Sequence, residues 1–384
     1  MAEWIDHIDA LGVISERSRH GLSRVISKNR RLTPRTLPLF LGSSVRDLRL
    51  YDCSGTFLPR SIDLPNVPRL CTYFTALNST SLQTIASLAP NIERLQLDYC
   101  GQLDAPAFRS LWRLSHLRHL ELYGPYLVRR EDWLEFLRER GEQLTSFLIR
   151  ETPRFDRTCI ETLAQHCVNV TELRLAQVGK LDDEGAQCLA GMRCLHHIDL
   201  SQPGVSQPGV PPASLTDKGV IPVLERHGTH LRSLHLGKNE ALSDATIDAI
   251  GATIECLILD FLAHVHESTW IRLWHRCTQL TSVSVRGIGM TDASLEALVR
   301  HARSLQVLNI NSNDDLTPAA FNALAEARLP LKTLDVGFVR CVDDSILSML
   351  ADAMPTLKAL YVFGCPRVKH FSRADITVVG REQR

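Results

Sequence analysis

A nine-residue pattern recurs along almost the whole chain and constrains its fold more than any other feature. The pattern is apolar-x-x-apolar-x-apolar-x-x followed by Cys, Asn or another residue, as in IERLQLDYC and LQVLNINSN. Successive copies begin 22 to 27 residues apart, with one interval of 36 residues. The copies begin at Val45, Val67, Ile92, Leu117, Leu144, Val170, Leu195, Leu231, Ile254, Leu280, Leu305, Leu331 and Leu357. This regularity predicts a chain of about thirteen stacked units.

Each unit is predicted to be a short strand followed by a helix. The L-x-L segment alternates with the period of a strand, and the residues after it switch to helical spacing, as in TDASLEALVRHA. Hydroxyl residues mark helix starts, because Thr216, Ser243 and Thr291 precede Asp and Thr317 precedes Pro. A period near 26 is typical of leucine-rich repeats. We therefore predict an α/β leucine-rich-repeat solenoid, with a parallel sheet on the concave side and helices on the convex side.

The repeats are expected to form a single domain over residues 45–384, with a short C-terminal cap, because one strand-helix unit cannot bury its apolar face alone. Cys or Asn at the end of the strand pattern should turn the chain out of the strand, at Cys53, Cys100, Asn239, Asn313 and Cys365. Residues 1–44 are expected to be a basic, helical N-terminal cap. The segment 201–214, SQPGVSQPGVPPAS, predicts an irregular loop that either reaches over the concave wall or is an inert expansion.

Composition and motifs argue against several classes of protein. No apolar run reaches the roughly 18 residues that a membrane-spanning helix needs, and the first ten residues lack the features of a secretory signal. The eleven cysteines contain no C-x-x-C pair, so we expect free thiols in a soluble, intracellular protein. No phosphate-binding loop and no common hydrolase or zinc motif is present. We expect no catalytic site, no metal and no cofactor.

The predicted binding surface is the concave wall, where strand residues between the leucines point to solvent. Six arginines and seven carboxylates at these positions make the wall mixed in charge, whereas a DNA-binding groove needs a basic stripe. Tyrosines among mixed charges are typical anchors of protein interfaces, although these aromatic residues could instead pack between strands. The predicted partner-binding residues are Tyr51, Tyr73, Glu121, Tyr123, Arg174, Asp199, Asp260, Arg286, Tyr361 and Phe363.

The N-terminal cap is the one strongly basic segment. Between residues 16 and 40, seven basic side chains face only Glu16. Arg24, Lys28, Arg30 and Arg31 are therefore candidates for contact with phosphate or with an acidic partner, and a solvated cap face is the alternative. Direct binding of damaged DNA through this cap is a separate hypothesis, while DNA contact by the rest of the chain is expected to be indirect or weak.

The repeats resemble the cysteine-containing leucine-rich-repeat family. The consensus of that family pairs L-x-x-L-x-L-x-x-C with a following (I/L)-(T/S)-D. In this chain the first half is found as IERLQLDYC, and the second half as SLTDKGV, LSDATID and MTDASLE. Two end segments are more specific. Both look like the leucine-rich-repeat subunit of the fungal global-genome nucleotide excision repair complex. They are residues 27–54, SKNRRLTPRTLPLFLG…VRDLRLYDCS, and residues 360–382, LYVFGCPRV…ITVVGRE.

That resemblance implies a non-enzymatic adaptor in the nucleus. It implies that the protein acts together with a Swi/Snf-type DNA-dependent ATPase that has a RING finger. It also implies association with Elongin C and a cullin in a ubiquitin ligase that acts on the damage-recognition factor. Members of the family have a longer N-terminal region with an Elongin-binding box; the nearest string here, TLAQHCVNV, departs at its last position. A truncated chain is therefore one expectation. Because F-box proteins share such repeats, a cullin-RING substrate receptor unrelated to repair is the alternative function.

Overall fold

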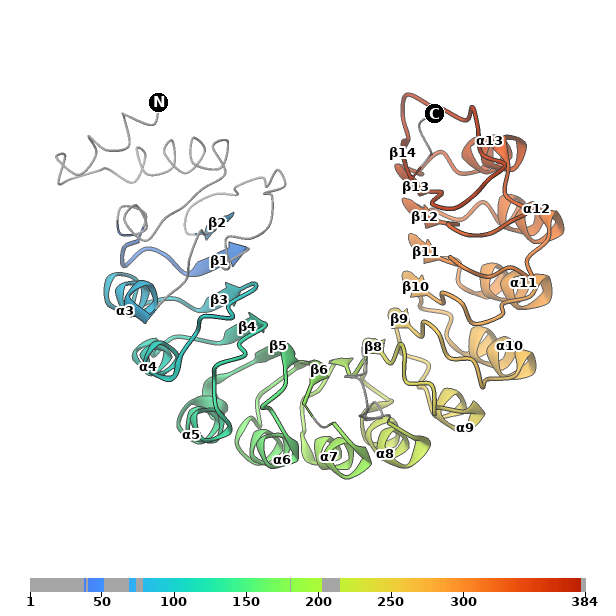
Figure 1. The fold of residues 1–384 in the computed structure, drawn as a ribbon. Coiled ribbons are helices and arrows are strands. Elements are labelled where there is room, and N and C mark those ends of the chain that lie inside the picture. Colours follow the sequence, from blue (N-terminus) through green and yellow to red (C-terminus); the bar gives the residue numbers. More distant parts are fainter. Residues whose placement is uncertain are drawn as a thin grey trace, which may run out of the picture. The chain divides into compact units, whose positions relative to one another are not determined.

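The structure is a computed structural model that divides into two compact units. Unit 1 comprises Met1–Lys180 and Gly191–Cys194, and unit 2 comprises Leu181–Ala190 and Leu195–Arg384. In each unit the strands lie on one side and the helices on the other (Figure 1). The structure describes residues 38, 41–51, 69–73, 79–179, 181–201 and 215–380, and for residues 51, 69–73 and 79 it describes only the backbone. Most of the predicted N-terminal cap, with Arg24, Lys28, Arg30 and Arg31, and residues 202–214 of the predicted loop lie outside these residues.

Unit 1 holds the first six repeats. Its strands are β1 (Asp47–Tyr51), β2 (Arg69–Tyr73), β3 (Arg94–Leu97), β4 (His119–Tyr123), β5 (Ser146–Thr152) and β6 (Glu172–Val178). Its described α-helices are α3 (Ser79–Leu88), α4 (Ala105–Arg109), α5 (Arg130–Arg140) and α6 (Arg157–His166). All strand pairs are parallel, in the order β2-β1-β3-β4-β5-β6. The first two strands thus depart from chain order: Leu48 of β1 pairs with Leu70 on one edge and with Leu95 on the other.

Unit 2 holds the remaining seven repeats and one extra strand. Its strands are β7 (His197–Asp199), β8 (Ser233–His235), β9 (Cys256–Ile258), β10 (Ser282–Ser284), β11 (Val307–Asn309), β12 (Thr333–Asp335), β13 (Ala359–Tyr361) and β14 (Thr377–Val379). Its α-helices are α7 (Asp183–Cys188), α8 (Asp217–His227), α9 (Asp244–Asp248), α10 (Glu267–Arg276), α11 (Asp292–His301), α12 (Pro318–Ala327) and α13 (Asp344–Ala353). Short 3-10 helices follow α4, α5 and α7, at Ser110–Arg113, Gly141–Gln143 and Leu189–Gly191.

The predicted repeat positions are confirmed along the described chain. Each of the thirteen predicted copies contains a strand that begins two residues after the copy begins. The predicted helix starts at Asp217, Asp244, Asp292 and Pro318 are also confirmed, and the hydroxyl before each of them accepts a hydrogen bond from the backbone of its own helix. The fold is therefore a leucine-rich-repeat α/β solenoid, and β14, which pairs with β13, is an addition that the repeat pattern did not predict.

The core of each unit is a stack of apolar layers. In unit 1 the strand register places Leu95, Leu120, Phe147 and Leu173 side by side, each no more than 1% exposed. In unit 2 the row Leu234, Leu257, Val283, Leu308, Leu334 and Leu360 is equally buried. Burying one such side chain contributes about 1.5–3 kcal/mol, so each layer stabilises both of its neighbours.

The chain leaves most strands through one repeated turn. The second residue after the last core position has a positive φ in many repeats, namely Tyr99, Glu151, Gln177, Lys238, Phe261, Ser312 and Phe338 among the non-glycine residues. The next residue points inward, and Cys or Asn there bonds to a neighbouring carbonyl: Cys100 Sγ donates to Tyr123 O and Cys365 Sγ to Val336 O, both at 3.2 Å. The prediction that Cys and Asn close the strand motif is confirmed for the described residues, which exclude Cys53.

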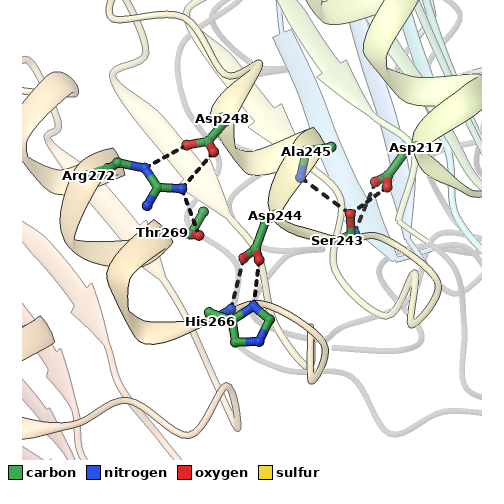
Figure 2. Close-up of polar contacts among 8 residues, drawn as sticks. All are labelled: Asp217, Ser243, Asp244, Ala245, Asp248, His266, Thr269 and Arg272. Atoms are coloured by element: carbon green, nitrogen blue, oxygen red, sulfur yellow. Dashed lines mark hydrogen bonds and ion pairs between the residues drawn. The ribbon is translucent and has the colours of Figure 1, made fainter.

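A row of acidic side chains links the helix N-termini of neighbouring repeats in unit 2. Asp217 accepts hydrogen bonds from the backbone N (2.9 Å) and Oγ (2.5 Å) of Ser243, the N-cap of α9. Asp244 accepts from the backbone N (2.9 Å) and Nδ1 (2.5 Å) of His266, the N-cap of α10 (Figure 2). The same link joins Asp183 to Thr216, Glu267 to Thr291, and Asp292 to Thr317. At the end of the row, Asp344 of α13 accepts from the backbone N of residues 369–371, which follow β13 and begin no helix. We call these contacts the cap ladder.

Replacing Asp217 with Asn is expected to destabilise unit 2 mostly at neutral pH. Burial raises the pKa of Asp217, but hydrogen bonds from Ser243 and Thr246 outweigh that effect and hold the pKa below its usual value of 3.8. A lowered folded pKa means that the carboxylate stabilises the fold above the unfolded pKa, and that this contribution is lost as the pH falls through the folded pKa. We expect a loss of about 1–2 kcal/mol at pH 7 and a smaller loss near pH 3, measured by urea unfolding.

The control is Glu240→Gln, which changes an exposed carboxylate in the next repeat, the one that contains Ser243. This variant should unfold like the parent at both pH values. Equal destabilisation of Asp217→Asn at both pH values would contradict a role for the charge of Asp217, because a merely steric effect does not titrate.

Candidate protein-binding surface

The residues between the core leucines lie on the side of the sheet away from the helices, which we call the open face. Burial alternates in β3 and β4 as predicted: in β4 the side chains of Glu121 and Tyr123 are half-buried, whereas the adjacent Leu120 and Leu122 are fully buried. Strand geometry explains this alternation, since successive side chains point to opposite faces of a sheet. The open face of unit 1 is therefore a surface of polar and aromatic side chains above an apolar core.

A pocket of about 270 Å³ lies on the open face of unit 1. Three of the predicted partner-binding residues, Glu121, Tyr123 and Arg174, line it together. The other lining residues are Gln96, Asp98, Tyr99, Leu122, Leu148, Ile149 and Arg150. We call this feature the unit 1 pocket.

An ion pair forms one wall of the unit 1 pocket. Arg174 Nη1 of β6 donates to Glu121 Oε1 of β4 at 3.1 Å, with about a third of each side chain exposed. The strand register places Leu148 of β5 between them, opposite both Glu121 and Arg174. The pair therefore spans the intervening strand and covers Leu148, which is only 7% exposed.

Tyrosines form the other wall. The rings of Tyr99 and Tyr123 lie 4.3 Å apart between centroids, and the guanidinium of Arg150 lies 4.9 Å from the centroid of the Tyr123 ring. Tyr123 and Tyr126 donate their hydroxyl hydrogens to the two carboxylate oxygens of Glu151, at 2.8 and 2.5 Å. Burial, together with the Glu151 contact, raises the pKa of Tyr126 to about 12 and that of Tyr123 above its usual value, so both hydroxyls remain donors. These contacts hold the rings in place as rigid anchors.

Asp98 is the most unusual acid of the pocket. Burial raises its pKa to about 6; the nearby charge of Glu121 adds to the rise, whereas the hydrogen bond from Gln96 and the two arginines oppose it. Burial also raises the pKa of Glu121, against the pull of Arg174. The folded protein therefore holds two carboxylates whose ionised forms are disfavoured by their surroundings.

The open face of unit 2 carries the remaining predicted residues in smaller groups. Asp260 Oδ1 accepts from Ser284 Oγ at 2.7 Å and from the backbone N of Arg286 at 3.0 Å, and the Arg286 guanidinium lies 5.4 Å from the Phe261 ring centroid. The other predicted residues lie elsewhere on this face. Asp199 ends β7, Tyr361 ends β13, and Phe363 follows β13. The side chains of the predicted residues Tyr51 and Tyr73 lie outside the part of the chain that the structure describes.

Sequence reasoning missed several residues in the turns after the strands. Tyr99 and Glu151 of the unit 1 pocket region have positive φ, as does Phe338, which is 54% exposed beside Phe363 at 46%. The strand alternation does not extend to these positions. Aligning the thirteen repeats on the second residue after the last core position would have found them.

Three other features of the described residues bear on function. No helix among them is long and apolar enough to cross a membrane. Within the same residues no group of three or more His, Cys, Asp or Glu side chains could hold a metal ion. None of the nine cysteines whose side chains the structure describes forms a disulfide.

The repeat geometry and the open face define this chain as a leucine-rich-repeat protein. No model of a protein family matches its sequence. It is 29% identical over 393 residues to the DNA repair protein rhp7 of Schizosaccharomyces pombe, an alignment that covers 100% of this chain and 64% of rhp7. It is also 29% identical over 401 residues to the DNA repair protein RAD7 of Saccharomyces cerevisiae, over 97% of this chain and 64% of RAD7.

The fold also matches a solved structure. The crystal structure of the Rad7 and Elc1 complex in yeast has a chain that is 27% identical, with a TM-score of 0.77 over 97% of this chain and 90% of that one. These findings confirm the resemblance to the leucine-rich-repeat subunit of the fungal global-genome nucleotide excision repair complex. The chain spans 64% of the length of both curated relatives.

Proposed function

We propose that this protein is a non-enzymatic adaptor in nuclear DNA repair that binds a protein partner on the open face of unit 1. Two relatives that align over nearly all of this chain carry the name DNA repair protein, which supports the process. The observation that carries the binding role is the unit 1 pocket, where rigid tyrosines stand beside carboxylates and arginines. Aromatic and arginine anchors around a desolvated centre are what protein interfaces use to bind tightly.

The adaptor is further proposed to act within a ubiquitin-ligase and ATPase assembly. Its proposed partners are a Swi/Snf-type ATPase with a RING finger, Elongin C, a cullin and the damage-recognition factor. The similarity to Rad7, which was solved in complex with Elc1, supports the Elongin C partner. Purifying the tagged protein from nuclear extract tests this assembly, and recovery of neither the ATPase nor any repair or ligase subunit would refute it.

The chemistry of the pocket favours a partner that inserts a lysine or arginine. Asp98 and Glu121 are disfavoured as ions in the free protein, so a cation placed against them would restore part of the lost solvation. The rings of Tyr99 and Tyr123 would cover the apolar stem of such a side chain. A basic segment of the partner is therefore the proposed occupant.

Replacing Asp98 with Asn is expected to weaken partner binding at least about tenfold at pH 7, because a cation in the pocket would lose its charged partner. The same change should leave the fold as stable or make it more stable. The reason is the raised pKa of about 6, which means that ionising Asp98 costs stability once the pH rises above the unfolded value of 3.8. The measurements are quantitative capture of the co-purifying subunits on immobilised wild-type and variant protein, and thermal unfolding.

A matched control is Asp248→Asn on the helix side of unit 2, where Asp248 pairs with Arg272 at 2.7 Å (Figure 2). This variant should retain full binding. Wild-type binding should also fall as the pH drops below about 6, and this fall should be absent in Asp98→Asn. Undiminished capture by a folded Asp98→Asn protein would place the partner elsewhere.

A further inference from the structure

A second group of polar side chains crosses three neighbouring strands on the open face of unit 2. Asp199 ends β7, His235 ends β8 and Cys256 begins β9. Asp199 pairs directly with His235 in the strand register, and Cys256 lies opposite Ser233, diagonal to His235. The group has no part in the unit 1 pocket.

The three side chains form a relay with the imidazole in the middle. His235 Nδ1 lies 3.4 Å from Asp199 Oδ2, and His235 Nε2 lies 3.8 Å from Cys256 Sγ. Ser201 fixes the carboxylate, since its backbone N and Oγ donate to Asp199 Oδ1 at 3.0 and 2.5 Å. Ser233 Oγ lies 3.4 Å from the same Nε2. The imidazole is thus held between a carboxylate and a thiol, and the side chains are partly exposed, 21% for His235 and 14% for Asp199.

The electrostatics agree with this geometry. Burial disfavours all three charges, but the mutual hydrogen bonds and charges outweigh it. They lower the pKa of Asp199 to about 2 and raise that of His235 to about 9. The imidazolium of His235, with Ser233 and Ser282, likewise holds the pKa of the Cys256 thiol below its usual value. Cysteine thiolates beside a protonated histidine are the reactive ones, because the thiolate is the nucleophile.

We propose that Cys256 is a modification site that reacts with small disulfides of the glutathione type. The Cys256 thiolate attacks one sulfur of the disulfide, a new S–S bond forms between Cys256 and that sulfur, and the original S–S bond breaks. The second sulfur leaves as a thiolate, so Cys256 is oxidised and that sulfur is reduced. The proton that left the Cys256 thiol remains on His235, and no further oxidant is needed.

Other cysteines of the chain provide the contrast. Burial raises the pKa of Cys341, which is partly exposed on unit 2. Cys100, Cys159, Cys167 and Cys277 are buried, and burial raises the pKa of each above its usual value. Cys256 is partly exposed and carries the opposite shift. Cys341 is therefore an internal reference for reactivity in one experiment.

The test measures the rate of labelling of each cysteine in the folded protein at pH 7, by peptide mass spectrometry, with iodoacetamide and with glutathione disulfide as separate probes. Cys256 is expected to react about tenfold or more faster than Cys341 with both probes. His235→Gln should lower the Cys256 rate by about tenfold, and Asp199→Asn should lower it too, because less imidazolium faces the thiol. His264→Gln, an exposed histidine after β9, is the matched control and should leave the rate unchanged.

Equal rates at Cys256 and Cys341 would overturn the proposal, as would a Cys256 rate that is the same in the wild type and in His235→Gln. Circular dichroism and thermal unfolding check that each variant folds. If His235→Gln does not fold, the wild-type rate ratio and Asp199→Asn decide the question. Rapid alkylation by iodoacetamide without a mixed disulfide from glutathione disulfide would show an activated thiol that small disulfides do not reach, and would refute the modification site.

Discussion

Replacing Asn313 with Ala is expected to destabilise unit 2 by about 3–5 kcal/mol, since each buried polar group left without a partner costs about 1–3 kcal/mol. Asn313 is fully buried. Its Nδ2 donates to the carbonyls of Val285 and Ile310, both at 2.9 Å, and its Oδ1 accepts from the backbone N of Ile288 (3.1 Å) and Met290 (3.0 Å). The side chain therefore satisfies four backbone groups in two successive repeats. The measurement is the free energy of unfolding from urea or thermal denaturation.

Asn239 provides a graded comparison at the same position of another repeat. Its Nδ2 donates to the carbonyls of Leu200 (3.0 Å) and Leu236 (2.9 Å), but its Oδ1 has no hydrogen-bond partner among the described residues. Asn239→Ala should therefore cost about 2 kcal/mol, less than Asn313→Ala. Asn322→Ala, on the exposed side of α12, should be close to neutral. If Asn239→Ala and Asn313→Ala lost the same free energy of unfolding, the number of hydrogen bonds could not be the cause of the loss.

The positions of the repeats could be predicted from the sequence because each repeat solves the same packing problem. The strands must pair so that equivalent positions of successive repeats lie side by side, because only this register buries Leu95, Leu120 and Leu173 together. The structure has that register. The hydroxyl caps were equally predictable, because the bond that Thr216 Oγ1 accepts from the backbone N of Lys218 is local. Local and periodic signals are the ones that a single sequence carries.

Contacts between repeats could not be read in the same way. The (T/S)-D signature predicted the caps, but the sequence does not show that Asp217 also bonds Ser243 one repeat later. The unit 1 pocket has the same origin, because Glu121 and Arg174 meet across the intervening strand, two repeats apart. Such pairs depend on how successive repeats stack, and a list of strand residues between leucines contains them without indicating which ones touch.

The relay around Cys256 was missed for a related reason. Among its three members only Asp199 was predicted as a surface residue, on account of its charge. His235 and Cys256 lie 21 residues apart, a spacing that matches no metal or catalytic motif. The parallel register nevertheless brings them to within 3.8 Å. In a repeat protein, residues separated by nearly one period are neighbours, so searching at that spacing would have found the pair.

Replacing Trp133 with Ala is expected to destabilise unit 1 by about 3–5 kcal/mol, the range for losing a large aromatic side chain from a core. Trp133 of α5 is fully buried. Its ring lies 4.7 Å from that of Phe108, 5.3 Å from that of Phe155 and 6.0 Å from that of Phe147, measured between centroids. These partner rings come from the repeats on either side of Trp133. The cavity left by the alanine would therefore lie between stacked repeats, and no single repeat could shift to fill it. Thermal and urea unfolding measure the loss.

Trp133→Phe separates lost volume from lost polarity. The indole Nε1 of Trp133 is buried without a hydrogen-bond partner among the described residues, so phenylalanine removes an unsatisfied donor along with part of the ring. We expect a cost below about 2 kcal/mol. Phe147 directly precedes Leu148, which lies beneath the Glu121–Arg174 pair, so Trp133→Ala should also weaken capture of the partner, whereas Trp133→Phe should preserve it. A Trp133→Phe variant as unstable as Trp133→Ala would show that the indole is held by something other than ring packing.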